Sequence, residues 1–248
     1  MHQKKINNNK NINLISEKIT KKLSRIGFGS RRQLEKFIEA GRVSVNGEII
    51  FNPALRVSES CILTFDGKKV PKMEVTRLWK LYKPKGTLCS NFDPKGRRLI
   101  FDLLPPSLPR VISIGRLDYN TEGLLLLTNN GEFSRKLELP SSGYSRRYKV
   151  RVNGKAQKDK ISSLSEGIII NSIKYRPIEA TLEKENKNNF WLNIKLIEGK
   201  NREIRNIMEF FGWQVSRLIR VNFGPFSLGS LEVNNVEEIN HSSFKDLL

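Results

Sequence analysis

The chain has 248 residues, of which 38% are hydrophobic, so it is long enough to bury a core as one or two globular domains. Its 44 Lys and Arg against 25 Asp and Glu give a formal net charge of +19, which indicates a polyanionic partner, with nucleic acid as the first candidate. A run of about 18 apolar residues is absent and residues 1–14 lack the apolar core of a secretory signal, so we expect a cytoplasmic protein with no membrane partner.

The residues that most often carry catalysis or bind metals are scarce. Cys61 and Cys89 form no CxxC pattern, and His2 and His241 lie near opposite ends of the chain. We therefore expect neither a metal site nor a histidine-dependent nucleophile. The segment "GPFSLGS" has no P-loop lysine and "GFGSRRQ" lacks the third glycine of a dinucleotide loop, so we expect no nucleotide cofactor either. An enzymatic reaction would depend on carboxylate, Tyr, Lys or Arg side chains.

The N-terminal third is the most basic part of the chain. Residues 1–80 hold 17 Lys and Arg against seven Asp and Glu. Residues 1–15 are polar and predict a flexible basic tail, whereas residues 16–40 have the apolar spacing of two helices divided by "GFGS", with Ser30 as a cap of the second. "RVSVNGEII" alternates around Asn46-Gly47 like a tight hairpin. From the residues alone, an RNA-binding surface and an ordinary solvated surface are equal alternatives here.

The stretch "KLSRIGFGSRRQLEKFIEAGRVSVNGEII" resembles the S4 domain, a small RNA-binding module of two helices and a small sheet. The resemblance covers roughly residues 16–72. It implies that the second helix and the hairpin contact structured RNA without reading its sequence. The phosphate contacts that it implies are Arg25, Arg31, Arg32, Lys36 and Arg42.

Residues 73–77 predict a short linker to a second domain over residues 78–248. Strand-like runs dominate this domain, namely "RLWKLYK", "VISIG", "LLLLT", "RYKVRVNG", "GIIIN", "FWLNIKLIEG" and "SLEVNNV". Helices interrupt them, most clearly at 201–212, where apolar residues follow the i, i+3, i+4, i+7 pattern. We expect an α+β fold.

Three segments of the second domain stand out. Asp118 lies in the turn "GRLDYNTEG" before four leucines, Tyr148 lies in "RRYKV", and Arg205 lies in "EGKNREIRNIMEF". Taken singly, each has an ordinary interpretation as a turn residue, a packed strand tyrosine or a solvated helical arginine.

Together these motifs resemble the pseudouridine synthases, in particular the family of bacterial ribosomal small-subunit and large-subunit enzymes. "YKPKG", "GRLDYNTEGLLLLTNNGEF", "RRYKVRV" and "EGKNREIRNIMEFFG" occur in the order of that family, with the S4 resemblance upstream. The resemblance implies a catalytic domain built on a mixed, mainly antiparallel sheet with flanking helices.

It also implies the chemistry. Asp118 takes the position of the essential catalytic carboxylate, Arg205 that of its basic partner, and Tyr148 that of the aromatic residue stacking on the target base. The reaction would break the bond between ribose C1′ and uracil N1, turn the base and rejoin C1′ to C5, without a cofactor. The residues leave open whether Asp118 acts as a nucleophile or as a base.

The target uridine must leave its stack to be rotated, so the reaction requires base flipping. By resemblance, Arg116 fills the gap left in the RNA, Lys83 and Lys85 contact its backbone, and Ile204 packs against the flipped base.

Local matches to "KPKGTLCSNFDPKGRR" and "QVSRLIRVNFGPF" point to the large-subunit branch B, and so to 23S rRNA. Two alternatives stay open, namely the same chemistry on 16S rRNA and a non-catalytic S4-type assembly factor that binds rRNA. We expect a monomer.

Overall fold

The computed structural model describes residues 16–72 and 74–248, so the predicted tail over residues 1–15 lies outside the described residues. The chain divides into two compact units, Met1–Val75 and Thr76–Leu248. In the described parts of the chain, every helix is too short or too polar to cross a membrane. Each unit is described by itself below.

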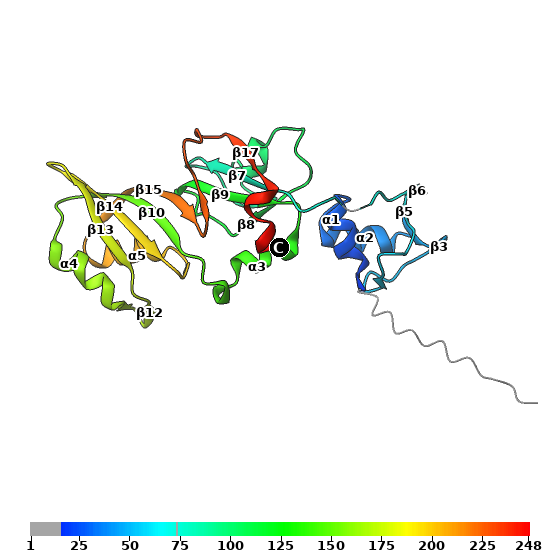
Figure 1. The fold of residues 1–248 in the computed structure, drawn as a ribbon, viewed down its shortest axis with the longest axis horizontal. Helices are drawn as coiled ribbons and strands as arrows, with labels where there is room; N and C mark the ends of the chain where they lie inside the picture. The colour runs from blue at the N-terminus through cyan, green and yellow to red at the C-terminus, as the bar shows by residue number, and fades with distance from the viewer. Residues whose placement is uncertain (1–15, 73) are drawn as a thin grey trace, which may run out of the picture. The chain divides into compact units, whose positions relative to one another are not determined.

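The N-terminal unit, drawn in blue in Figure 1, packs two helices against small sheets. Ser30 caps the second helix through a reciprocal capping box with Gln33, as predicted. The hairpin turn at Asn46 and Gly47 is also confirmed, with φ values of 51° and 93°. The helices are α1 (Ile19–Ile26) and α2 (Arg31–Glu39); one sheet has the order β3 (Glu48–Ile49), β2 (Val43–Val45), β5 (Leu63–Phe65) and β6 (Lys68–Lys69), and β1 (Glu17–Lys18) pairs with β4 (Arg56–Val57).

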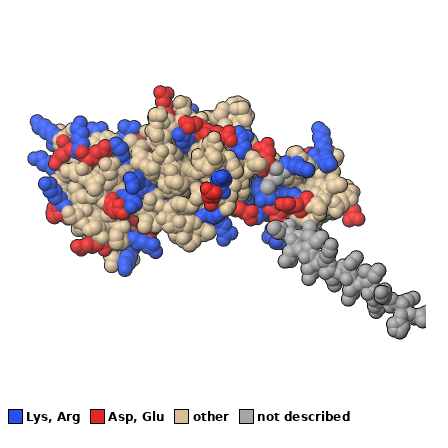
Figure 2. All heavy atoms as spheres, viewed as in Figure 1, with Lys and Arg blue, Asp and Glu red and all other residues tan. Residues whose placement is uncertain are grey.

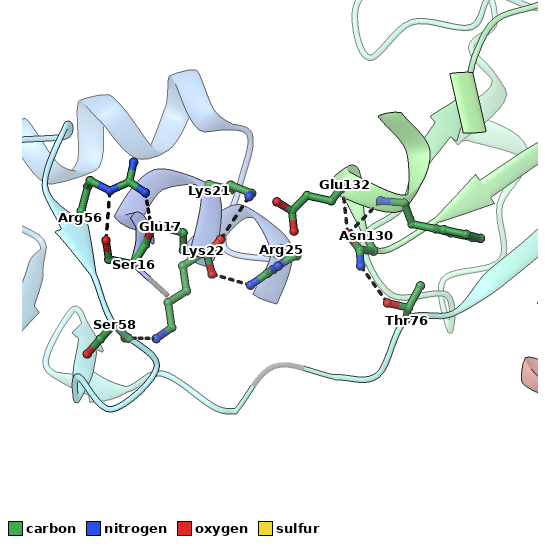
Figure 3. A network of polar contacts seen from close by, with 11 residues as sticks. Ser16, Glu17, Lys21, Lys22, Arg25, Arg56, Ser58, Thr76, Asn130 and Glu132 are labelled. Carbon is green, nitrogen blue, oxygen red and sulfur yellow. Dashed lines mark hydrogen bonds and ion pairs between the residues drawn. The ribbon is translucent and has the colours of Figure 1, made fainter. Parts of the chain in front are cut away.

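Polar contacts join the first helix of this unit to its sheets. Glu17 accepts from Arg25 and lies 3.7 Å from the ammonium of Lys21, while Lys22 donates to the carbonyl of Ser58 (Figure 3). The apolar faces of both helices meet the sheet in one small core. The core residues are Ile19, Leu23, Leu34, Ile38, Val43, Val57, Leu63 and Val70.

The C-terminal unit is built on a nine-stranded sheet (Figure 1). All its strand pairs are antiparallel except the pair of β9 with β15, which confirms the predicted α+β class and mixed, mainly antiparallel sheet. The strand order is β13 (Glu179–Glu185), β14 (Asn189–Leu196), β10 (Arg146–Asn153), β15 (Gln214–Phe223), β9 (Glu122–Thr128), β7 (Leu78–Lys83) and β17 (Val236–Ile239), with β8 (Ile112–Ile114) on β9 and β16 (Phe226–Ser227) on β15.

Short helices and one separate hairpin complete the unit. Asn130 caps α3 by accepting from the backbone of Glu132 and Phe133, and it also donates to Thr76 (Figure 3). The helices are α3 (Gly131–Glu138), α4 (Lys158–Ser163) and α5 (Glu203–Phe210), the hairpin is β11 (Ile168–Ile170) with β12 (Ile173–Tyr175), and 3₁₀ turns lie at Ile100–Leu103, Pro140–Ser142, Leu164–Glu166, His241–Ser243 and Lys245–Leu247.

One predicted strand differs from the structure, and several strands of this unit, among them β13 and β15, were not predicted. "SLEVNNV" predicts a strand, but Val233 and Asn234 form a turn and the strand begins only at Val236, because Asn234 adopts a left-handed φ of 72°. The central strand β15 was not predicted, since Arg217 and Arg220 interrupt its apolar pattern.

Candidate active site

A cavity of about 870 Å³ lies at the centre of the C-terminal unit. Its walls come from the turn between β8 and β9, from β10 and β15, and from the loop before α5. Basic groups outnumber acidic ones, so the cavity suits an anionic ligand. The charged residues of its lining are Arg116, Arg146, Lys200, Arg202 and Arg220 against Asp118, Glu138 and Glu203.

Asp118 lines this cavity from the turn that precedes β9. The backbone N–H of Thr121 donates to the Asp118 carbonyl over 3.0 Å and closes the turn. The four leucines that follow, Leu124–Leu127, are fully buried in β9, which pairs with both β7 and β8. Within the described residues the Asp118 carboxylate has no hydrogen-bond partner, so it is available to a ligand.

Lys83 supports the turn from inside the protein. Its side chain is fully buried, and its ammonium donates to the carbonyls of Thr121 at 2.9 Å and Pro84 at 3.0 Å. Burial lowers the pKa of Lys83 to about 8, although the charges of Cys89, Asp118 and Glu122 oppose that shift. The predicted RNA contact of Lys83 is therefore wrong, because a buried ammonium engaged by two carbonyls does not reach RNA.

Arg205 holds the same turn from the side of α5. One of its terminal nitrogens donates to the Asn120 carbonyl over 2.8 Å, and the other to Val215 over 3.4 Å. Burial and the charge of Arg202 lower the pKa of Arg205, while the nearby Asp118 raises it. Arg205 thus attracts Asp118 electrostatically but bonds to the backbone two residues beyond it.

Tyr148 and Arg220 form the cavity wall on the neighbouring strands. They are register partners on β10 and β15, and a bulge follows Arg147. Arg220 is 3% exposed and donates through Nε to the Leu124 carbonyl over 2.8 Å. Its buried Nη2 has no partner among the described residues, so this arginine can still donate a hydrogen bond to a ligand.

The loop before α5 and the first turn of α5 also line the cavity. Ile204 is buried and lines the cavity, as does the neighbouring Glu203, whose Oε2 accepts from the Lys200 N–H over 3.0 Å. Burial raises the pKa of Glu203 to about 7, and the adjacent Glu198 carboxylate adds to the rise.

The two remaining predicted RNA contacts of this unit are exposed. Arg116 lines the cavity two residues before Asp118. Lys85 lies on the turn after β7, where the Gly86 N–H donates to the Tyr119 carbonyl over 2.8 Å.

The predicted contacts of the N-terminal unit separate into two groups. Arg31, Arg32 and Lys36 are exposed on α2. Arg42 instead makes a bidentate ion pair with Asp66, at 2.8 and 2.5 Å, and stacks on Phe37 and Phe65; Arg25 is paired with Glu17. Ion pairs therefore engage the Arg25 and Arg42 guanidinium groups, and a phosphate contact of either would have to replace its ion pair; these two phosphate contacts stay predictions. On the face of the molecule shown in Figure 2, basic side chains are interspersed with acidic ones.

Sequence reasoning missed Arg146, Glu203 and Arg220 as cavity residues. Arg220 carried a usable signal, since it is the one charged residue in the short run Leu218–Val221. Arg146 and Glu203 carried none, because a charged residue at a strand or helix start is ordinarily solvated.

Comparisons with known proteins assign the family. A sequence profile described as RNA pseudouridylate synthase matches residues 77–210, and one described as S4 domain matches residues 20–60. The chain belongs to the RNA pseudouridine synthase family. It is 42% identical over 234 residues to a Rickettsia typhi protein named an uncharacterized RNA pseudouridine synthase, covering 93% of this chain and 95% of that one.

Two further relatives agree with this assignment. The synthase is 41% identical over 227 residues to ribosomal large subunit pseudouridine synthase B of Yersinia pestis, covering 86% of this chain and 69% of the relative. A crystal structure of a pseudouridylate synthase matches with a TM-score of 0.64 and 26% identity, over 92% of this chain and 98% of that one. The predicted family, enzyme class and S4 domain are therefore confirmed.

Proposed function

We propose that this synthase converts one uridine of 23S rRNA into pseudouridine with Asp118 as the catalytic carboxylate. The observation that carries the proposal is that Asp118 is the carboxylate on the turn between β8 and β9, unpartnered within the described residues, in a basic cavity. The large-subunit target rests on the printed name of the Yersinia pestis relative.

The surroundings of Asp118 support its role as a reacting group. Lys83 and Arg205 fix the backbone of its turn through the Thr121 and Asn120 carbonyls and hold positive charge near the carboxylate. An ionised carboxylate is required whether it attacks the nucleotide or removes a ribose proton.

The other cavity residues take roles around the flipped nucleotide. Tyr148 stacks on the uracil while its bond from N1 to C1′ is replaced by one from C5 to C1′, and Ile204 packs against the base. C5 loses its proton in this exchange and N1 gains one, so the product is an isomer of the substrate. Arg116 enters the space that the uridine leaves, and Lys85 contacts the RNA backbone. The free Nη2 of Arg220 lies on the same wall as Tyr148 and offers a donor to the RNA.

The target is tested by incubating purified protein with unmodified 16S and 23S transcripts and mapping pseudouridine chemically, with mass-spectrometric confirmation. We expect one new site, in the 23S transcript. Pseudouridine in the 16S transcript alone would mean that the target lies in the small subunit. No pseudouridine in either transcript or in partly assembled subunits would favour a non-catalytic rRNA-binding role.

A further inference from the structure

The loop of residues 90–98, "SNFDPKGRR", lies at the rim of the cavity, since Ser90 lines it. Its two ends are held together at Leu88, whose N–H donates to the Arg98 carbonyl over 3.0 Å and whose carbonyl accepts from Ile100 over 2.9 Å. The chain thus leaves and re-enters the fold at one point, and most residues between, Asn91, Phe92 and 94–98, are exposed.

Internal hydrogen bonds brace this loop. Asp93 accepts from the backbone N–H, Nε and Nη2 of Arg97, at 2.9, 3.1 and 2.7 Å. Ser90 Oγ accepts from the Phe92 N–H at 3.2 Å and donates to the Phe92 carbonyl at 2.7 Å. The backbone that carries Phe92 is therefore ordered before any partner binds.

Phe92 itself points away from the protein. Its side chain is 76% exposed, more than any other large hydrophobic residue in the described parts of the chain. A single exposed apolar side chain is ordinary, but this ring is held out on a braced loop without joining any of the described core clusters. Such an arrangement favours a partner that covers the ring.

The neighbours of the ring indicate the chemistry of that partner. Lys95 and Arg98 are exposed, and neither has an ion pair among the described residues. The other exposed residues of the loop are polar, glycine or proline, so Phe92 is not part of the larger apolar patch that a protein partner requires. The flat Phe92 ring can stack on a nucleic-acid base, and the cationic side chains of Lys95 and Arg98 can contact the neighbouring phosphates.

The loop also has a defined position relative to Asp118. The Arg97 guanidinium lies 5.9 Å from the ring centroid of Tyr119, the residue after Asp118. The Tyr119 backbone is fixed in turn by Gly86. Phe92 is therefore held near the turn on which the target uridine would react.

We propose that Phe92 is a stacking platform for an unpaired base next to the target uridine. The inference rests on the proposed function, because flipping one uridine out of its stack frees the faces of its neighbours. Lys95 and Arg98 contact the phosphates that flank the stacked base.

The test compares Phe92→Ala, Phe92→Leu and Phe92→Tyr in the full chain. We expect Phe92→Ala and Phe92→Leu to raise the Kd for unmodified 23S transcript about tenfold, because stacking requires a ring. The Kd of Phe92→Tyr, which keeps a ring, should stay within about twofold of wild type. Ile169→Ala removes another exposed apolar side chain from the same unit and serves as the control.

A second readout reports stacking directly. The exposed tryptophan of Phe92→Trp should lose fluorescence when the transcript binds, beyond any change of the wild-type tryptophans. An unchanged Kd in Phe92→Ala, or a Leu variant equal to Tyr, would overturn the inference, as would an effect that appears only with ribosomal proteins present. If wild type makes no pseudouridine, the proposed function fails, while the binding measurements still decide the stacking role.

Discussion

At the scale of single residues, burial shifts the pKa values of two charged groups of the site, Lys83 behind the Asp118 turn and Glu203 in the cavity wall. Lys83 is buried and its pKa is lowered to about 8, so it still carries its charge at neutral pH behind the Asp118 turn. Glu203 is buried beside Glu198 and its pKa is raised to about 7, so it is largely protonated below neutrality. As the pH falls, Lys83 therefore stays charged behind the turn, while the cavity loses one of its anions, Glu203.

Glu203 gives a pH-dependent prediction for stability. An acid whose pKa is higher in the folded state than in the unfolded state binds more protons when folded, so the free energy of unfolding falls as the pH rises. For Glu203 this loss of stability occurs between pH 4.5, the ordinary pKa of a Glu side chain, and about pH 7, its pKa in the folded protein. Gln does not ionise, so the Glu203→Gln variant should not lose this stability. Its free energy of unfolding should therefore rise relative to wild type between pH 5 and 8, by up to a few kcal/mol.

Urea unfolding of both proteins at pH 5 and pH 8 measures this difference. Glu209→Gln removes an exposed carboxylate from the same helix and controls for the lost charge alone. A wild-type advantage that grows with pH would show that Glu203 is stabilised in its ionised form instead.

At the scale of secondary structure, the site depends on the parallel contact of β9 with β15. This pairing joins Glu122 to Ile219 and Gly123 to Arg220 directly after the Asp118 turn. A Cβ at Gly123 would lie 2.3 Å from the Arg220 carbonyl oxygen, and the φ of 102° is unfavourable for other residues. The glycine of "TEG" is therefore required by close backbone approach.

Gly123→Ala should lower the free energy of unfolding by roughly 2 to 4 kcal/mol, because the two backbones must separate. Gly131→Ala is the matched control, since Gly131 starts α3 and an added Cβ there meets only Ile112 at 3.5 Å, an ordinary contact. Thermal or urea unfolding compares the two variants. Equal stability of both would contradict the close approach of β9 and β15.

The same elements show which parts of the structure the sequence could predict. The helices at 16–40, the hairpin at Asn46 and most strands follow from periodicity and turn chemistry, which are local. Asp118 and Tyr148 were found by motif resemblance, and they line one cavity. The burial of Lys83 and the strand β15 could not be predicted, because both depend on contacts between segments far apart in the chain, Lys83 with Thr121 and β15 with β10 and β9.

At the scale of the whole molecule, the synthase joins a catalytic unit to a basic S4 unit that carries exposed Arg31, Arg32 and Lys36. These side chains contact phosphates and do not recognise bases, so they should strengthen binding to any structured RNA. The choice of uridine should then depend on the cavity and its rim.

Replacing Arg31, Arg32 and Lys36 together by Ala should weaken 23S transcript binding on the order of tenfold at moderate salt. The slope of log K against log salt should fall in magnitude by about 2, because each lost phosphate contact contributes about 0.7 to 0.9. Filter binding across a salt series measures both values. A variant in which Lys155, Lys158 and Lys187 become Ala loses the same charge elsewhere, and an equal effect there would argue against a specific S4 contact.

The central claim is that Asp118 carries the reaction, and single-turnover release of tritium from 23S transcript labelled at uridine C5 tests it most directly. Asp118→Asn should reduce the rate to less than about one thousandth of wild type while the Kd for the transcript stays within a few-fold. Asp159→Asn, which changes an exposed carboxylate on α4, should keep the wild-type rate. Substantial tritium release by Asp118→Asn would contradict the account and require another group to react with the uridine.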